Sequence, residues 1–255
     1  MRESDHARSG DRERLISSAL GEITAGGAGD VVEAAHALTR WSLRLLDVSG
    51  AGVMMADDRG VLRSVMVSSE AVRGLEAVEL DLGRGPCVES HRQARAVIHP
   101  DLDVPDARWP EFAPQARASG MRAAHAIPMI DRGAAIGVLN LFRTSSGGLT
   151  DADAALAQAL ADAAGTAASQ KIAAPLGARE VAAAFADAAI TERAKGMLSV
   201  RLQVDIDTAF AVLRRVARDR GRGVGDLAAD VVSGDATLAL PLSVEPQPPA
   251  ASGRD

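Results

Sequence analysis

Basic side chains gather in one segment of an otherwise acidic chain. Between Glu192 and Arg222, eight basic residues outnumber four acidic ones, a local charge of +4, whereas the 255-residue chain carries −6. The basic residues are Arg193, Lys195, Arg201, Arg214, Arg215, Arg218, Arg220 and Arg222. Because a guanidinium can donate two hydrogen bonds to one phosphate, the segment indicates a polyanionic partner. On charge alone, a solvated helix face is the favoured interpretation, and a polyanionic partner is the alternative.

A second candidate for chemistry is the pair Cys87 and His91, which stand at i,i+4 on an expected short helix. Such a pair can act as nucleophile and base or as two metal ligands. The sequence fixes no third partner, although His99 and His125 are available. Free cysteine is among the most buried residue types, so structural packing is favoured over redox or metal sensing. We expect no catalytic site and no metal site.

Composition restricts the class of protein. The apolar fraction of 47% is ample for a packed core, and a single cysteine excludes an intramolecular disulfide. The first residues are charged and lack the apolar region of a signal peptide. No run approaches the roughly 18 apolar residues of a membrane span. These features predict a cytoplasmic protein that contacts no membrane, and the scarce aromatic residues argue against binding single strands by base stacking.

The N-terminal two thirds alternate helical and strand patterns. We expect an α+β fold in which helices flank an antiparallel sheet. The expected elements are a helix from Asp30, hairpins at 51–68 and 121–144, helices at 71–80 and 86–92, a strand at 96–98, a helix ending at Gly120, and a long helix from 151. Thr150 and Asp153 are the expected capping residues of the long helix.

The C-terminal third is all helical. Three amphipathic helices are expected, from about Arg179 to Leu202, from about Asp207 to Asp219 with Asp205 as N-cap, and over Asp226–Val232. Their apolar stripes comprise Val181, Phe185, Ala189, Ile190, Ala194, Met197 and Leu198, then Ala209, Phe210, Leu213, Val216 and Ala217, then Leu227, Ala228, Val231 and Val232. Pro175 should break the helix that precedes them.

The order and spacing of "GPC", "RWP" and "IGVLNLF" resemble a GAF domain, in the form seen in actinobacterial members. The resemblance implies a domain that senses a small molecule or mediates dimerisation, with an unidentified ligand and no cofactor. The pattern "AKGML" followed by "DTAFAVLRRVARDR" resembles the ANTAR domain, a three-helix RNA-binding module of bacterial antiterminators. One departure is Gln203, which stands where that family often has glycine.

Together the resemblances define the expected domains. They are a disordered tail at 1–12, a GAF-like domain at 13–170, a helical linker with a proline break at 171–178, an ANTAR-like domain at 179–234, and a disordered tail at 235–255. The expected RNA-binding residues are Arg193, Lys195, Gly196, Arg201, Arg214, Arg215 and Arg218. The expected ANTAR core is Ala194, Met197, Leu198, Ala209, Phe210, Leu213 and Ala217. Cys87 and His91 are the candidate sensor residues.

The leading hypothesis from the resemblance is a transcription regulator. It would bind paired stem-loops in nascent transcripts as an antiterminator, and form a homodimer through the helical stalk and the GAF domain. The alternatives are a DNA-binding regulator and a sensor or dimer scaffold without nucleic acid. Gly196 has two interpretations, since a glycine inside a helix costs roughly 1 kcal/mol relative to alanine. It allows either close approach of another helix or close approach of RNA beside Lys195.

Overall fold

The computed structural model describes residues 2–25, 31–57, 59–172 and 177–234. The chain divides into two compact units, Met1–Phe185 and Ala186–Asp255. The predicted C-terminal tail lies outside the described residues, and so does Pro175 with its predicted helix break. Helix α6 ends at Ile172 and α7 begins at Gly177.

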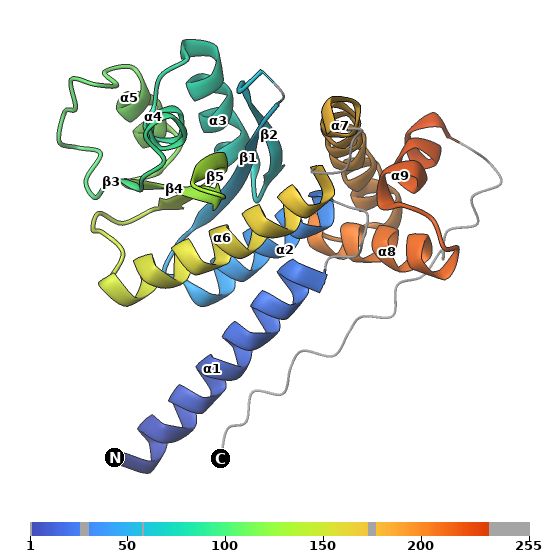
Figure 1. The fold of residues 1–255 in the computed structure, drawn as a ribbon, viewed down its shortest axis with the longest axis horizontal. Coiled ribbons are helices and arrows are strands. Elements are labelled where there is room, and N and C mark those ends of the chain that lie inside the picture. Colours follow the sequence, from blue (N-terminus) through green and yellow to red (C-terminus); the bar gives the residue numbers. More distant parts are fainter. Residues whose placement is uncertain (1, 26–30, 58, 173–176, 235–255) are drawn as a thin grey trace. The chain divides into compact units, whose positions relative to one another are not determined.

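A five-stranded antiparallel sheet is the centre of the N-terminal unit (Figure 1). Its strands are β1 (Gly50–Ala56), β2 (Leu62–Val67), β3 (Val97–His99), β4 (Ala123–Asp131) and β5 (Ala134–Arg143), in the order β2-β1-β5-β4-β3. The predicted hairpins are confirmed as β1–β2 and β4–β5. In the second turn, Arg132 and Gly133 have φ of 48° and 85°, the left-handed pair that matches the strand twist.

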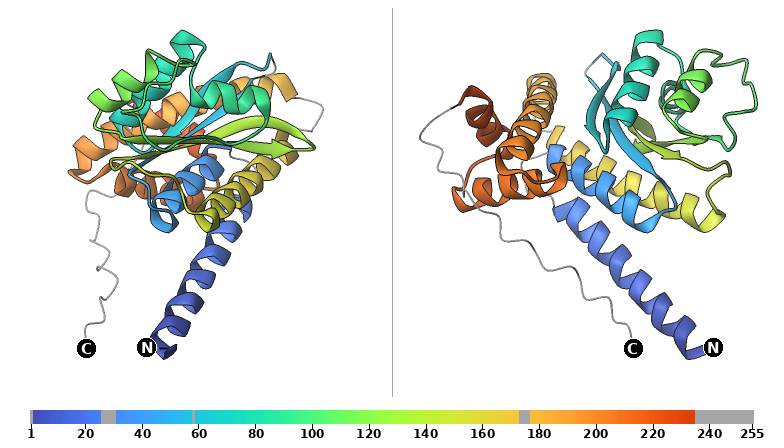
Figure 2. Two further views of the ribbon diagram at one scale, coloured as in Figure 1. Left: turned by 90° about the vertical axis from the view of Figure 1, so that its left-hand side faces the viewer. Right: turned by 180° about the vertical axis from the view of Figure 1, so that it is seen from behind.

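Helices cover both faces of this sheet, which confirms the predicted fold class (Figures 1 and 2). Helices α3 (Glu70–Leu82), α4 (Pro86–Gln93) and α5 (Phe112–Ala118) lie on one face, and α2 (Val31–Leu45) and α6 (Asp151–Ile172) lie on the other. The N-terminus of α6 has the predicted capping residues, because Thr150 Oγ1 accepts a hydrogen bond from the Asp153 amide at 3.1 Å.

The prediction of a disordered tail at 1–12 is wrong. Helix α1 spans Arg2–Ala25 and packs on α2 and α6. Ala19 and Ile23, one turn apart, are fully buried there, and Arg12 pairs with a carboxylate of α6 at 2.5 Å. The polar first turns hide this helix in the sequence, but its second half is packed, and extending a helix costs less free energy than starting one.

The C-terminal unit consists of three helices around one apolar core. They are α7 (Gly177–Leu202), α8 (Ile206–Asp219) and α9 (Val224–Ser233). The buried core comprises Ala194, Leu198, Ala209, Phe210, Val212, Leu213, Val216, Ala217, Val224, Leu227, Ala228 and Val231. Asp205 is the N-cap of α8, as predicted, and its carboxylate accepts from the Thr208 amide at 2.7 Å.

The backbone between α7 and α8 shows why the ANTAR pattern often has glycine at the position where this chain has Gln203. Gln203 adopts φ +53°, a left-handed conformation that costs an L-residue roughly 1–2 kcal/mol. The Val204 amide donates back to the Ser199 carbonyl at 3.1 Å, which closes the C-terminus of α7. The departure from the family pattern therefore leaves the turn intact and places the strain on Gln203.

Candidate nucleic-acid interface

Lys195 lies inside the C-terminal unit, not on its polar surface. Only 2% of its surface is exposed. Its Nζ lies 2.6 Å from Glu192 Oε1 and 5.4 Å from the centroid of the Phe210 ring of α8. A buried ammonium needs a hydrogen-bonded counter-charge, and the ring face adds cation–π attraction. This corrects the expectation that Lys195 presents its charge to RNA, because its ammonium pairs with Glu192 within α7 and lies over the Phe210 ring of α8.

The next residue, Gly196, lies about 100° around the helix from Lys195. Apart from its chain neighbours and the backbone of its own helix, no atom lies within 4 Å of the position that a Cβ on Gly196 would occupy. The close approach of another helix is therefore not the reason for this glycine. Its backbone is open to an external partner, as the second interpretation requires.

Around Gly196 lies an exposed surface that we call the outer face of α7. It comprises Arg193, Gly196, Met197, Val200 and Arg201, at the i, i+3, i+4, i+7 and i+8 positions of one helix face. Met197 was expected in the core, but it is 45% exposed, and Val200 is 81% exposed. The expectation for Met197 is thus corrected. With Lys195 turned inward, the apolar stripe of α7 is rotated, and the thioether side chain lies on the surface.

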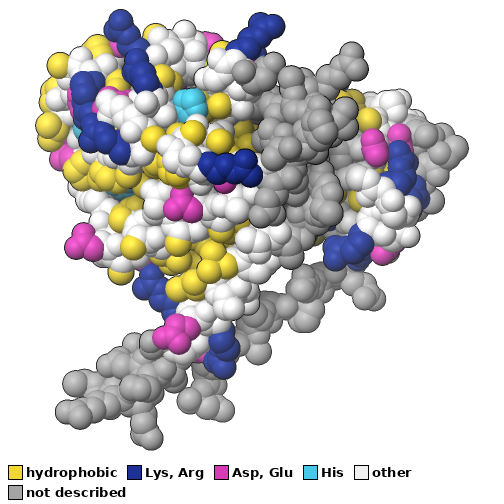
Figure 3. Space-filling model, viewed as in Figure 1, with side chains coloured by type: hydrophobic (Ala, Val, Ile, Leu, Met, Phe, Trp, Pro, Cys, Tyr) yellow, Lys and Arg dark blue, Asp and Glu magenta, His cyan; other side chains and the backbone are white. Residues whose placement is uncertain are grey.

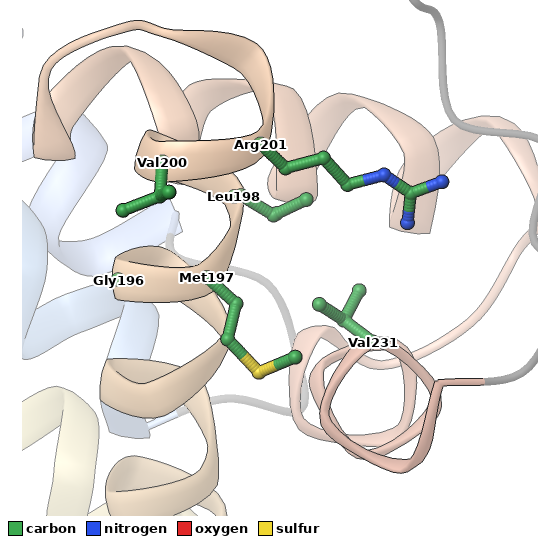
Figure 4. Close-up of a pocket in the computed structure, with 6 residues that line it drawn as sticks. All are labelled: Gly196, Met197, Leu198, Val200, Arg201 and Val231. Carbon is green, nitrogen blue, oxygen red and sulfur yellow. The ribbon is translucent and has the colours of Figure 1, made fainter.

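A hollow of about 450 Å³ opens beside this face. Its lining residues are Gly196, Met197, Leu198, Val200, Arg201 and Val231 (Figure 4). In the close-up, Met197 and Arg201 extend from α7 toward the side where Val231 of α9 lies, and the end of Met197 comes near Val231. The hollow thus combines apolar walls with one guanidinium at its edge.

The arginines of α8 form a second basic group. Arg215 and Arg218 are exposed and stand three residues apart, on the same side of the helix, whereas Arg214 is half-buried. Arg222, just after α8, pairs with Asp230 of α9. Basic and acidic side chains lie close together on the part of this unit visible in Figure 3. Arg193, Arg201, Arg215 and Arg218 are thus the predicted binding residues with exposed side chains.

The candidate sensor residues in the N-terminal unit do not form a Cys–His pair. Cys87 is fully buried, and its amide donates to Glu79 Oε1 at 2.9 Å. Burial, followed by the nearby Glu79, raises the pKa of the Cys87 thiol well above its usual range. Burial lowers the pKa of His91, and the Ala135 backbone of β5 partly opposes this shift. A thiol that stays protonated lacks the thiolate that nucleophilic or redox chemistry needs.

Two buried carboxyl groups near Cys87 were not anticipated from the sequence. Glu76 accepts hydrogen bonds from Ser64 Oγ at 2.5 Å and from Asn140 Nδ2 at 3.0 Å. Burial raises its pKa to about 7, and burial raises the pKa of Glu79 to about 8. Gly52 makes room for the first carboxyl, because a Cβ there would lie 2.1 Å from Glu76 Oε1. A single charged residue on an amphipathic helix gives no signal that it points inward.

The other histidines of the described residues are not part of a metal site either. Among the residues that the structure describes, no group of three or more His, Cys, Asp or Glu side chains could hold a metal ion. His125 is buried, and burial, with a contribution from Arg143, lowers its pKa to about 4. It is therefore neutral at physiological pH. Within the same described part of the chain, no helix has the length and apolarity needed to cross a membrane.

The chain consists of a sheet-based domain followed by a small helical one. The GAF-domain model matches residues 30–168, more than half of the chain, and the ANTAR-domain model matches residues 179–232. The chain therefore belongs to the GAF-domain family and carries an ANTAR domain after it. Both are regulatory and not catalytic domain types. A search of curated proteins gave no match.

Solved structures share the fold of the N-terminal unit. The GAF domain of a phosphoenolpyruvate-protein phosphotransferase from Coxiella burnetii is 14% identical, with a TM-score of 0.51 over 62% of this chain and 93% of that chain. A type II free methionine-R-sulfoxide reductase from Thermoplasma acidophilum is 15% identical, with a TM-score of 0.44 over 61% and 96%. The first similarity supports the GAF fold. At these identities no activity is carried over.

Proposed function

We propose that this protein is an RNA-binding transcription regulator. It binds paired stem-loops in nascent transcripts and acts as an antiterminator in the cytoplasm. The observation that carries this proposal is the set of exposed arginines on the unit that matches the ANTAR domain. Hairpin loops expose bases that A-form helices hide, so a small helical unit can reach them.

The exposed charges have separate tasks in this proposal. Arg215 and Arg218 of α8 and Arg193 and Arg201 of α7 contact phosphates, and arginine suits this role because its planar fork can donate two hydrogen bonds. Lys195 positions α7 on α8 from inside the unit and does not contact RNA. Charged contacts with phosphates release counterions, so binding weakens steeply as salt increases.

The N-terminal unit is the proposed regulatory input. A small molecule or partner bound there, or dimerisation through the GAF domain and the helices that follow it, would set the spacing of two ANTAR domains. Replacing residues 172–180 by a flexible linker of equal length should abolish the effect of such an input while RNA binding by each ANTAR domain remains. An input whose effect survives the replacement would rule out this coupling.

Crosslinking the protein to RNA in cells and sequencing the bound transcripts tests the proposed function. The expected result is a consensus of two adjacent stem-loops upstream of a terminator. Binding in vitro then separates RNA from DNA, because duplex DNA of the same sequence should not compete at equal concentration. The proposal would be contradicted if crosslinking recovered no transcript above background, or if the protein preferred the duplex DNA in the competition.

A further inference from the structure

We infer that the hollow between α7 and α9 takes one unstacked nucleobase of the bound RNA loop. This inference rests on the RNA-binding function proposed above and names the group that the outer face of α7 recognises. The hollow, lined by Gly196, Met197, Val200, Arg201 and Val231 together with Leu198, measures about 450 Å³. That is within the roughly 300–1,000 Å³ of small-molecule sites, so it has room for a nucleoside-sized group.

The walls of the hollow suit the face of a base. Met197 and Val200 are large apolar side chains that remain 45% and 81% exposed, so the core of the unit leaves them at the surface. Met197 is a flexible, polarisable thioether that makes favourable contacts with aromatic rings. Phe210, the one aromatic residue in the sequence after position 185, is buried in the core. A base that binds this unit must therefore contact aliphatic, thioether and guanidinium groups.

The open backbone at Gly196 gives the base access. A side chain at this position would stand beside Val200, one turn away on the same face, and would narrow the hollow (Figure 4). Arg201 stands at the edge of the hollow with an exposed side chain. Its guanidinium can stack on a base or hydrogen-bond to a base edge or phosphate, as arginine does in loop recognition.

Charge favours a nucleic acid over a second copy of this chain in the hollow. Arg193 and Arg201 flank Met197 and Val200 along about 12 Å of helix, at 1.5 Å per residue. A two-fold contact through this face would bring the same arginines of both copies together, and like charges would repel. On α9, Asp230 already pairs with Arg222, so its charge is partly neutralised. A polyanion that offers one apolar base face fits both features.

The test uses the full chain and a two-hairpin RNA selected from randomised loops for binding to it. Each loop nucleotide is replaced in turn by an abasic one, and each RNA is measured with the wild type, with the double variant Met197→Ala/Val200→Ala, and with Ile206→Ala. Ile206 is a matched control, because it is a 46% exposed aliphatic residue of the same unit outside the hollow.

At one loop position, the abasic change should weaken wild-type binding about fivefold to tenfold. This is the lower end of the range of effects known for the loss of one stacked base. The double variant should bind the intact RNA more weakly by a similar factor and lose no more at that abasic position. Its salt dependence should match that of the wild type, because no phosphate contact is removed. Ile206→Ala should behave as wild type throughout.

Two results would overturn the inference while the proposed function stands. In the first, the wild type binds RNA in a salt-dependent way, but the free-energy effects of the abasic change and of the double variant are additive at every loop position. The other is a double variant that binds RNA normally but changes the self-association measured by sedimentation, which would assign the hollow to a protein contact. Failure of the selection to yield any salt-dependent RNA ligand would instead overturn the proposed function itself.

Discussion

The two units of the chain place their ionisable groups in opposite ways. In the N-terminal unit, Glu76, Glu79 and His125 are buried. Burial raises the pKa of both glutamates and lowers the pKa of the histidine, so each group favours its neutral form. The C-terminal unit buries one charged side chain, Lys195, among its described residues, and pairs it with Glu192. Its arginines remain largely at the surface. Protonation of the buried carboxyl groups therefore favours the folded state of the first unit, whereas the exposed arginines of the second unit are the groups that we propose contact RNA.

The largest expected effect tests the buried charge of the C-terminal unit. Lys195→Ala should destabilise this unit by about 3 kcal/mol, because it removes a buried side chain that pairs with Glu192 and lies over the Phe210 ring. Hydrogen exchange should show a roughly hundredfold loss of protection for the amides of α8. Both tryptophans, Trp41 and Trp109, lie in the N-terminal unit, so the tryptophan-fluorescence melt should not change.

Arg193→Ala is the matched control for this variant. Arg193 is exposed on the same helix, and a surface substitution should change stability by no more than about 0.5 kcal/mol. If Lys195→Ala kept full protection of α8 but lost RNA affinity, Lys195 would be a direct contact, and the division between inward Lys195 and outward Gly196 would fail.

The next effect tests the exposed charge of the same unit. Arg215→Ala/Arg218→Ala should weaken RNA binding roughly tenfold to a hundredfold and reduce the slope of log affinity against log salt by about 2. Its stability should stay that of the wild type. Arg132→Ala is the control, because its side chain is 78% exposed in the other unit, and it should bind normally. An unchanged slope in the double variant would remove α8 from the interface.

The pH dependence of stability tests the buried carboxyl groups of the N-terminal unit. The pKa values of Glu76 and Glu79 are raised from 4.5 to about 7 and about 8, so the folded state holds protons that the unfolded state releases. Their contribution is complete below pH 4.5 and is lost as pH rises through 7 to 8. The melting temperature of the N-terminal unit, followed by tryptophan fluorescence, should therefore fall by several degrees from pH 5 to pH 8.

Glu79→Gln should flatten this pH dependence, because an amide takes no part in the proton balance. The Gln side chain can still accept from the Cys87 amide through its carbonyl oxygen. A slope that is as steep in Glu79→Gln as in the wild type would assign the pH dependence to other groups.

The smallest effect concerns the turn between α7 and α8. Gln203 is left-handed at φ +53°, and glycine adopts that conformation without the Cβ penalty. Gln203→Gly should stabilise the C-terminal unit by about 1 kcal/mol, visible as greater hydrogen-exchange protection of α8. Gln203→Val should do the reverse, since a β-branched residue at positive φ is strained. Equal protection in all three proteins would show that the turn relaxes in solution.

Much of the fold follows from local sequence signals. The hairpin turn at Asp131–Gly133, the capping pair Thr150 and Asp153, and the N-cap Asp205 each depend on a few adjacent residues, and the structure confirms each. Helix α1 was missed because its polar first turns have no apolar stripe. A signal for its second half was present, since Ala19 and Ile23 stand at i,i+4 in a short apolar stretch.

The site was harder to anticipate because it depends on which way α7 is rotated. Lysine is almost never fully buried, and its burial here requires both Glu192 and the Phe210 ring of another helix. Met197 has core spacing, yet the rotation that buries Lys195 exposes it. Patterns along one helix do not carry this tertiary information. The openness at Gly196 likewise appears only when α7 is placed beside its neighbours.

The most direct test of the account is Gly196→Ala, measured for both stability and RNA affinity. Because space is open at this position, alanine should leave hydrogen-exchange protection of α7 unchanged or raise it by up to the roughly 1 kcal/mol that glycine costs a helix. The account predicts that RNA affinity nevertheless falls severalfold, and further in Gly196→Leu. Stable variants of both kinds that bind RNA as tightly as the wild type would contradict the claim that RNA binds against the outer face of α7.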